Sequence, residues 1–269
     1  MRTFLLFLLL AGPLGAETGS LAQQAQLAWQ DRDKPGQTET AIRLWQQAVK
    51  AEPNRGELWI ALSKALGRAV RHAKTSTERE EWADQARDAA KAAVDLSPAS
   101  AEAYATYGEA LGQWANAHKG VHSLGTVHQA VEMLQKSIAI DPRYAYAHML
   151  LAEFYRQSPR FFSIGDKKKA LEQAQLAVDD GPDYAINHLV LARIWLDLDM
   201  KEKGIAELQK IATLTPPADA IPETRADQQT AAAMLQSLGI TPGEKGSSAT
   251  SQPPQCGEAG GVCSESSQP

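Results

Sequence analysis

Two histidines, His118 and His122, have the spacing in this sequence that best suits metal binding. Residues four apart lie on one face of a helix, so their imidazoles can reach the same divalent ion. A tetrahedral site needs four ligands, and no cysteine or second histidine pair stands beside them. Gly120, between them, favours the end of a helix. The pair is consistent with a metal-binding accessory role or with ordinary surface histidines, and the missing ligands favour the second.

Cys256 and Cys263 enclose six residues near the C-terminus. In an oxidising compartment two cysteines this close are expected to form a disulfide, and the glycines between them permit the tight loop. The spacing is not Cys-x-x-Cys, so it does not indicate a thioredoxin-like redox motif. Residues 241–269 contain 15 Gly, Ser or Pro out of 29, which predicts a disordered tail over residues 239–269.

No sequence pattern for catalysis stands out along the chain. It contains no nucleophile elbow, phosphate-binding loop, zinc-protease helix or dinucleotide fingerprint. The 269 residues carry a formal net charge of −5, whereas a surface for duplex nucleic acid needs an excess of basic residues. We therefore expect a protein that is not an enzyme, needs no cofactor and does not bind nucleic acid.

The composition and one internal repeat predict helices that pack closely. Hydrophobic residues make up 43% of the chain, enough to bury a core, and 45 residues are alanine, the strongest helix former. A small residue stands twelve positions before each of five prolines, and other packing residues stand eight and five positions before them. Separations of four and seven place these residues on one helix face. The prolines are Pro53, Pro98, Pro142, Pro182 and Pro216, and the small residues are Ala41, Ala86, Ala130, Ala170 and Gly204.

A second helix is predicted after each of the first four prolines. Large residues recur six, nine and thirteen positions after the proline, and a small one recurs ten positions after it. His148 and His188 occupy the sixth position, so we interpret them as packing residues rather than ligands. The four sets are Trp59, Leu62, Ser63, Leu66; Tyr104, Tyr107, Gly108, Leu111; His148, Leu151, Ala152, Tyr155; and His188, Leu191, Ala192, Trp195.

This pattern resembles the tetratricopeptide repeat (TPR), a helix–turn–helix unit that ends in proline. The match covers about residues 20–216 and implies an all-α fold, a right-handed α-solenoid of about five helix pairs. Insertions after Leu66 and Leu111 predict lengthened hairpins in the middle repeats, with capping boxes at Thr77–Glu80 and Thr126–Gln129. A final helix over 223–238 would cap the stack, so the repeat domain is expected over residues 17–238.

The inner helices of such a solenoid line a concave groove. Positions four, seven and eleven residues after each proline are expected to face it, giving an apolar stripe beside charges of alternating sign. We predict that a peptide segment or helix of a protein partner binds there. The other interpretation is that the charged row pairs internally and is merely solvated. The groove residues are Ile60, Lys64, Glu109, Tyr146, Met149, Glu153, Leu189 and Arg193.

Four aromatic residues fall in the insertions, at one edge of the predicted solenoid. They are Trp82, Trp114, Phe161 and Phe162. Long hairpins need a small core of their own, which favours packing between the hairpins. Trp and Phe are also enriched at interface centres, so a partner surface or a homo-oligomer interface stays open.

The N-terminus has the pattern of a secretory signal. Arg2 is followed by an apolar run over residues 4–11, too short to span a bilayer as a helix. Small residues precede Glu17, so we expect a signal peptide over residues 1–16 that is cleaved after Ala16. No later stretch is apolar enough to cross a membrane. The sequence therefore predicts an exported, soluble, periplasmic protein.

The first functional hypothesis is a non-catalytic periplasmic scaffold or adaptor that binds a protein partner during envelope assembly or maturation. A weaker resemblance favours a small-ligand-binding accessory subunit of an uptake system. The stretch from Ser158-Pro159 to Gly165-Asp166, before Lys167–Ala170, is similar to the periplasmic helical-repeat subunits associated with TRAP transporters. A metal-binding accessory protein using His118 and His122, with Cys256 and Cys263 open as further ligands, is the third hypothesis.

Overall fold

The computed structural model describes residues 20–120, 122–158 and 164–240, which form eleven helices and no strand. This confirms the predicted all-α fold. The helices, in chain order, are α1 (Leu21–Gln30), α2 (Gln37–Ala51), α3 (Gly56–His72), α4 (Ser76–Leu96), α5 (Ala101–Ala117), α6 (His122–Ile140), α7 (Ala145–Gln157), α8 (Lys167–Asp180), α9 (Ala185–Asp197), α10 (Lys201–Thr213) and α11 (Ile221–Ser237).

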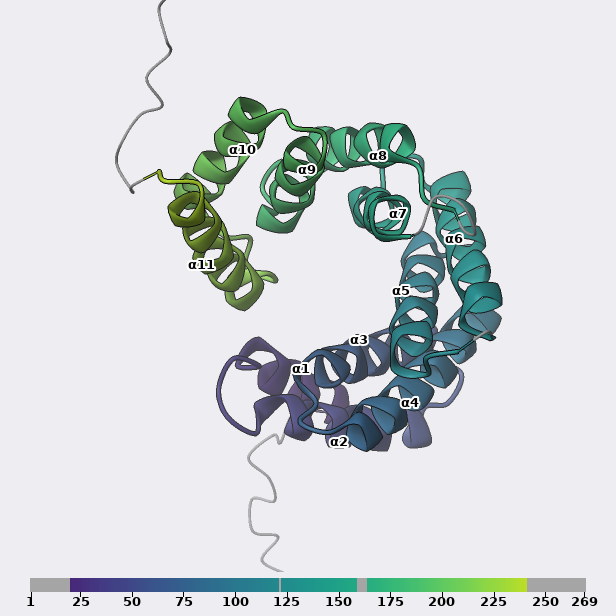
Figure 1. The fold of residues 1–269 in the computed structure, drawn as a ribbon. Helices are drawn as coiled ribbons and strands as arrows, with labels where there is room; N and C mark the ends of the chain where they lie inside the picture. The colour runs from purple at the N-terminus through teal and green to yellow at the C-terminus, as the bar shows by residue number, and fades with distance from the viewer. Residues whose placement is uncertain (1–19, 121, 159–163, 241–269) are drawn as a thin grey trace, which may run out of the picture.

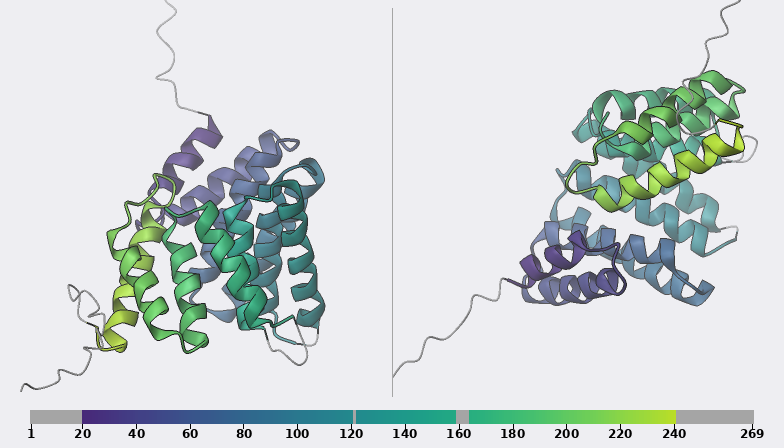
Figure 2. Two further views of the ribbon diagram at one scale, coloured as in Figure 1. Left: turned by 90° about the horizontal axis from the view of Figure 1, so that it is seen from above. Right: turned by 90° about the vertical axis from the view of Figure 1, so that its left-hand side faces the viewer.

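The first ten helices form five antiparallel pairs that follow one another around a ring (Figure 1). Helices α5, α7 and α9 lie on the inner side of the ring, and α6, α8 and α10 lie outside them. The last helix, α11, packs against α9 and α10 as the predicted capping helix. Seen from other directions, α11 and the first two helices face each other across the gap between the two ends of the ring (Figure 2).

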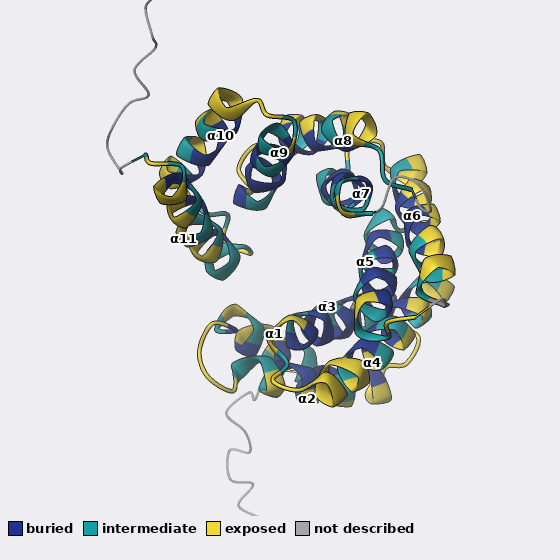
Figure 3. Ribbon diagram, in the orientation of Figure 1, coloured by how far each residue is buried: buried dark blue, intermediate teal, exposed yellow. Residues whose placement is uncertain are grey.

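Close approach of the two layers explains the high alanine content. Ala41, Ala86, Ala130 and Ala170, each twelve residues before a proline, are completely buried. At the fifth such position, a Cβ on Gly204 would stand 2.7 Å from Leu196 Cγ, a distance that real Cβ atoms essentially never adopt. Figure 3 shows the buried positions concentrated where inner and outer helices face each other. The predicted small-residue face is therefore the packing face.

Three of the four residues six positions after the prolines attach the turn to the helix that follows it. Trp59 Nε1 donates a hydrogen bond to the Pro53 carbonyl at 2.9 Å. His148 Nε2 and His188 Nε2 donate to the carbonyls of Pro142 and Pro182 in the same way, at 3.0 and 2.9 Å. Both histidines are buried, as expected for packing residues.

The middle hairpins are longer than the later ones, as the insertions predict. Helices α3–α6 contain 17–21 residues, whereas α7–α10 contain 13 or 14. The predicted capping boxes are wrong in detail. Helix α4 is capped by Thr75, whose side chain accepts from the backbone N–H of Glu78, so it begins before Thr77. Helix α6 begins at His122, which places Thr126 inside it.

Several predictions concern residues that the structure does not describe: the signal peptide, Phe161 and Phe162, Cys256 and Cys263, and residues 241–269. Among the helices that it does describe, none is both long and apolar enough to span a bilayer.

Candidate functional site

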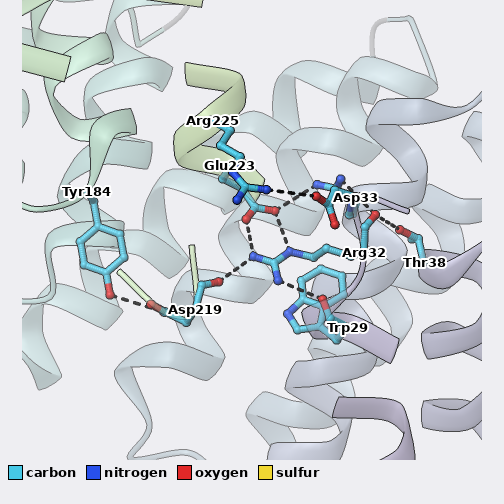
Figure 4. Close-up of polar contacts among 9 residues, drawn as sticks. Trp29, Arg32, Asp33, Thr38, Tyr184, Asp219, Glu223 and Arg225 are labelled. Atoms are coloured by element: carbon cyan, nitrogen blue, oxygen red, sulfur yellow. Dashed lines mark hydrogen bonds and ion pairs between the residues drawn. The ribbon is translucent and has the colours of Figure 1, made fainter. Parts of the chain in front are cut away.

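The two ends of the solenoid are joined by a cluster of polar contacts that we call the clasp, formed by Arg32, Arg68, Asp219 and Glu223. Figure 4 shows Arg32 between Asp219 and Glu223. Arg32 follows α1 and Glu223 lies in the first turn of α11, 191 residues later. Arg32 Nε donates to Glu223 Oε1 at 2.8 Å, and its Nη2 contacts Glu223 Oε2. Nη2 also donates to the Asp219 backbone carbonyl at 2.6 Å. The clasp therefore joins the first repeat to the capping helix α11 and the segment before it.

The surroundings of Arg32 hold its guanidinium in place. Arg32 is only 5% exposed, its guanidinium lies 4.6 Å from the Trp29 ring centroid, and Nη1 donates to the Trp29 carbonyl. Arg68 of α3 contributes a second ion pair to Glu223, at 3.0 Å, and donates to the Arg32 carbonyl. Burial raises the pKa of Glu223, but the hydrogen bond and positive charge of Arg32 outweigh it, so the pKa is lowered overall.

The closed ring surrounds a central cavity of about 650 Å³, within the size range typical of ligand sites. The clasp residues Arg32, Asp219 and Glu223 form part of its wall. Four of the predicted groove residues, Ile60, Lys64, Glu109 and Tyr146, also line it. The rest of the wall comes mainly from α1, α3, α5, α7, α9 and the turns that precede them, with contributions from α2 and the end of α8, and includes Trp29, Trp45, Glu57, Glu102, Arg71, Arg143, Tyr144, Asp180, Tyr184, Ile186 and Asn187.

Charged side chains on the cavity wall are paired across neighbouring repeats. Lys64 Nζ lies 2.5 Å from Glu102 Oε1, and Arg71 Nη1 lies 2.8 Å from Glu109 Oε1. Glu109 also accepts a hydrogen bond from the Tyr146 hydroxyl at 2.7 Å. This arrangement agrees with the interpretation that the charged row pairs internally. The pairs link successive inner helices and so help to fix the curvature of the ring.

Three tyrosines, Tyr144, Tyr146 and Tyr184, line the cavity together with the tryptophans Trp29 and Trp45. Tyr144 and Tyr146 meet edge to face, with ring centroids 6.5 Å apart. Burial and, after it, the negative charge of Glu109 raise the pKa of Tyr146 well above its usual range. Burial also raises the pKa of Tyr144. The tyrosines are therefore neutral at physiological pH and present uncharged rings and hydroxyls to an occupant.

Comparison with protein families agrees with this architecture. Residues 21–158, just over half of the 269-residue chain, match the family model described as Regulator of microtubule dynamics protein 1-3. The chain belongs to this family. The match begins at the start of α1 and ends just beyond α7, so Arg32 lies inside it and Glu223 outside.

Solved structures show the same kind of fold. TTC0263, a thermophilic TPR protein in Thermus thermophilus, is 19% identical with a TM-score of 0.61, and the match covers 78% of this chain and 98% of that one. MamA from Desulfovibrio magneticus RS-1 is 17% identical with a TM-score of 0.45, covering 79% and 97%. YrrB, a TPR protein with an unusual peptide-binding site, is 13% identical with a TM-score of 0.43, covering 82% and 91%.

At these identities the likeness shows the fold alone, and TTC0263 carries it: this member of the family has a TPR-type helical-repeat fold. Among curated proteins, none matches the chain. The matches named here give no support to the resemblance to TRAP transporter subunits.

The remaining predicted groove residues lie away from the cavity. Met149 and Leu189 are 5% and 1% exposed and belong to the hydrophobic core. Leu189 shares a core cluster with residues of α10 and α11, so the next elements cover it. Glu153 pairs with Arg156 at 2.8 Å and with Arg193 at 3.4 Å. The apolar stripe expected in the groove is therefore largely buried between helices.

The edge aromatics that the structure describes pack between hairpins. Trp114 Nε1 donates to Asp84 Oδ1 of α4 at 2.7 Å, and its ring stacks on His118 with centroids 4.4 Å apart. Trp82 packs on the core cluster of the first two repeats. These contacts agree with the packing interpretation.

The predicted metal pair is described only at His118. Its Nδ1 lies 3.2 Å from the Trp114 carbonyl and its Nε2 lies 3.6 Å from Asp84 Oδ2. The His122 side chain falls outside the description. Among the described side chains, no group of three or more His, Cys, Asp or Glu residues is placed to hold a metal ion.

Sequence reasoning missed the clasp and most of the C-terminal wall of the cavity. One signal was present: acidic residues recur every four positions at Asp219, Glu223 and Asp227. This spacing places their carboxylates on one face of the last helix and of the segment just before it. Nothing in the local sequence, however, shows that this acidic side meets Arg32.

Proposed function

We propose that this chain is a non-catalytic scaffold or adaptor that binds a segment of a partner protein in the central cavity. One observation carries the proposal: the inner side of the ring forms an open cavity of about 650 Å³ with a mixed aromatic, apolar and charged wall. Ligand sites are typically concave surfaces of this size, with a few polar groups that fix orientation. The TPR-type fold supports a non-catalytic role, because its concave face is the surface that such solenoids use for binding.

The family name also supports a protein partner, since regulators of microtubule dynamics act on a protein polymer. For this chain we propose a different setting, export to the periplasm and a role in envelope assembly or maturation. The apolar run over residues 4–11 supports export. Sequencing the N-terminus of protein recovered from the periplasmic fraction tests this part: a chain that starts at Glu17 is expected, and an intact Met1 in the cytoplasmic fraction would contradict it.

Site-specific crosslinking tests the binding role. A photoreactive phenylalanine derivative replaces Tyr184, which is 38% exposed on the cavity wall, in cells that express the protein naturally. The matched control carries the same group in place of Leu124, which is 42% exposed on α6 and does not line the cavity. Irradiation should produce protein adducts from position 184 and far fewer from position 124.

Mass spectrometry of the adducts identifies the partner and the attached segment. A single partner segment attached at position 184 is the expected result. Equal adduct patterns from both positions, or none from position 184, would remove the support for the cavity as the binding site.

A further inference from the structure

The charge balance of the cavity wall indicates which kind of segment it can receive. The wall contains four cationic side chains: Arg32, Lys64, Arg71 and Arg143. Each is already ion-paired with a carboxylate of the wall, by Glu223, Glu102, Glu109 and Asp180 respectively. An anionic group entering the cavity would therefore meet no unpaired cation on this wall. It would have to compete with the carboxylate that already pairs with each cation and would be repelled by it, which disfavours an acidic segment or a terminal carboxylate.

Two more carboxylates, Glu57 and Asp219, line the cavity without a cation of the wall as partner. Glu57 pairs with Arg55, which lies outside the cavity, and the side chains of both are well exposed. Within the described part of the chain, the Asp219 carboxylate has one polar contact, the Tyr184 hydroxyl at 3.4 Å (Figure 4). Asp219 is exposed. Its carboxylate is thus available to a cation that enters from outside.

The aromatic wall favours the same ligand class. Tyr184 is in contact with Asp219, and Tyr144 also lines the cavity. A tyrosine ring attracts a guanidinium or ammonium group through its negative face, and a nearby carboxylate adds a direct charge interaction. The apolar side chains of Ile60 and Ile186 can pack against the methylene groups of a long basic side chain.

We propose that the cavity takes a basic segment of the partner, with a Lys or Arg side chain that faces Asp219 and Tyr184. The inference rests on the proposed protein-binding role and adds the chemistry of the segment. The net charge of −5 of the whole chain favours the approach of a basic partner over an acidic one.

Binding of three capped pentapeptides to the purified protein tests the inference by calorimetry. The peptides are acetyl-Ala-Arg-Ala-Arg-Ala-amide and its counterparts with Gln or Glu in place of Arg. The Arg peptide is expected to bind about tenfold more tightly than the Gln peptide, and the Glu peptide more weakly than either. Raising the salt concentration should reduce the difference in affinity between the Arg and Gln peptides, because salt screens charges at this open site.

The variant Asp219→Asn should bring the Arg peptide close to the affinity of the Gln peptide. The clasp uses the backbone carbonyl of Asp219, so this substitution leaves that contact in place. The matched control is Asp88→Asn, which removes the same charge from a side chain 70% exposed on α4, outside the cavity. The control should keep the preference for Arg.

Equal affinity for the three peptides, tighter binding of the Glu peptide, or no binding of the Arg peptide at about 1 mM would overturn the inference. So would an equal loss in the Asp219→Asn and Asp88→Asn variants. These failures differ from failure of the protein-binding role. If the segment crosslinked at position 184 contains no Lys or Arg, the protein-binding role stands and the preference for a basic segment is wrong. If the Arg peptide binds specifically but no partner is crosslinked in cells, the preference for basic groups stands and the protein-binding role loses its support.

Discussion

The clasp predicts that one side chain, Arg32, controls both stability and the closure of the ring. Arg32→Met retains an unbranched chain against Trp29 but removes the guanidinium. The substitution deletes the ion pair with Glu223 and the hydrogen bonds to the carbonyls of Trp29 and Asp219. The perturbation is therefore confined to the contacts that close the ring and to the packing of α1.

The magnitude follows from burial. Removing one partner of a buried ion pair typically costs about 3–5 kcal/mol. The Glu223 side chain is 36% exposed and keeps Arg68 as a partner at 3.0 Å, so water and the second arginine compensate in part. We expect the free energy of unfolding to fall by about 2–3 kcal/mol. We also expect the radius of gyration to rise, because α11 loses its main polar attachment to the first repeat.

Urea denaturation measures the free energy of unfolding, and small-angle X-ray scattering measures the radius of gyration. Glu223→Met and the double variant complete a thermodynamic cycle, in which the coupling energy should exceed about 1 kcal/mol. Arg193→Met is the matched control, since its ion pair with Glu153 joins α7 and α9 and does not close the ring. Additive effects of Arg32→Met and Glu223→Met, with unchanged scattering, would refute the clasp.

Three further predictions concern single side chains. Burial raises the pKa of Asp227 to about 6, so Asp227→Asn should stabilise the fold by about 1 kcal/mol at pH 7.5. In denaturation experiments this gain should shrink as the pH falls through about 6 and vanish below about pH 3, where the carboxyl is protonated in both the folded and the unfolded state. Burial raises the pKa of Glu207, but hydrogen bonds from His188 and Lys210 lower it overall. Glu207→Gln should therefore lower the free energy of unfolding by about 1–3 kcal/mol at pH 7 and by progressively less below about pH 4. An equal loss of stability at pH 3 would contradict this. A Cβ on Gly108 would stand 2.7 Å from a leucine side chain, so Gly108→Ala should lower the melting temperature, whereas Gly125→Ala, where nothing lies within 4 Å, should leave it unchanged or raise it.

The sequence contained enough information to predict the helix pairs. Each proline ends a helix, and the residues twelve before it and six after it have fixed packing roles in successive repeats. These roles depend on contacts within one pair or between neighbours. They can therefore be read from short sequence separations, as the complete burial of Ala86 and the turn contact of His148 show.

Finer features depended on choices that the sequence leaves open. The start of α4 contains two overlapping Thr-x-x-Glu phrases, Thr75–Glu78 and Thr77–Glu80, and only the first forms the cap. Of the residues seven after each proline, Ile60 lines the cavity, whereas Met149 and Leu189 are buried in core clusters with residues of the next elements. Which side of an inner helix is covered depends on how closely the next helix packs, and that distance is not encoded in one repeat.

Closure of the ring could not be predicted from any local pattern. In an ordinary solenoid each repeat contacts only its neighbours, and the curvature is the sum of small rotations from one repeat to the next. Whether Arg32 meets Glu223, 191 residues away, depends on that sum over five helix pairs. A small change in the angle of each pair would leave the two ends far apart.

Closure also links stability to binding, because the same residues serve both. Asp219 offers its backbone carbonyl to Arg32 and its carboxylate to the cavity, and Glu223 belongs to both the clasp and the cavity wall. A partner that binds only the closed ring stabilises the clasp. By the same coupling free energy, a substitution that opens the clasp weakens the binding of that partner. Arg32→Met should therefore reduce the affinity of the Arg peptide although Arg32 is buried beside Glu223 and need not touch the peptide. Unchanged affinity in a variant whose ring has opened would show that the peptide binds to the wall of α3, α5 and α7 alone.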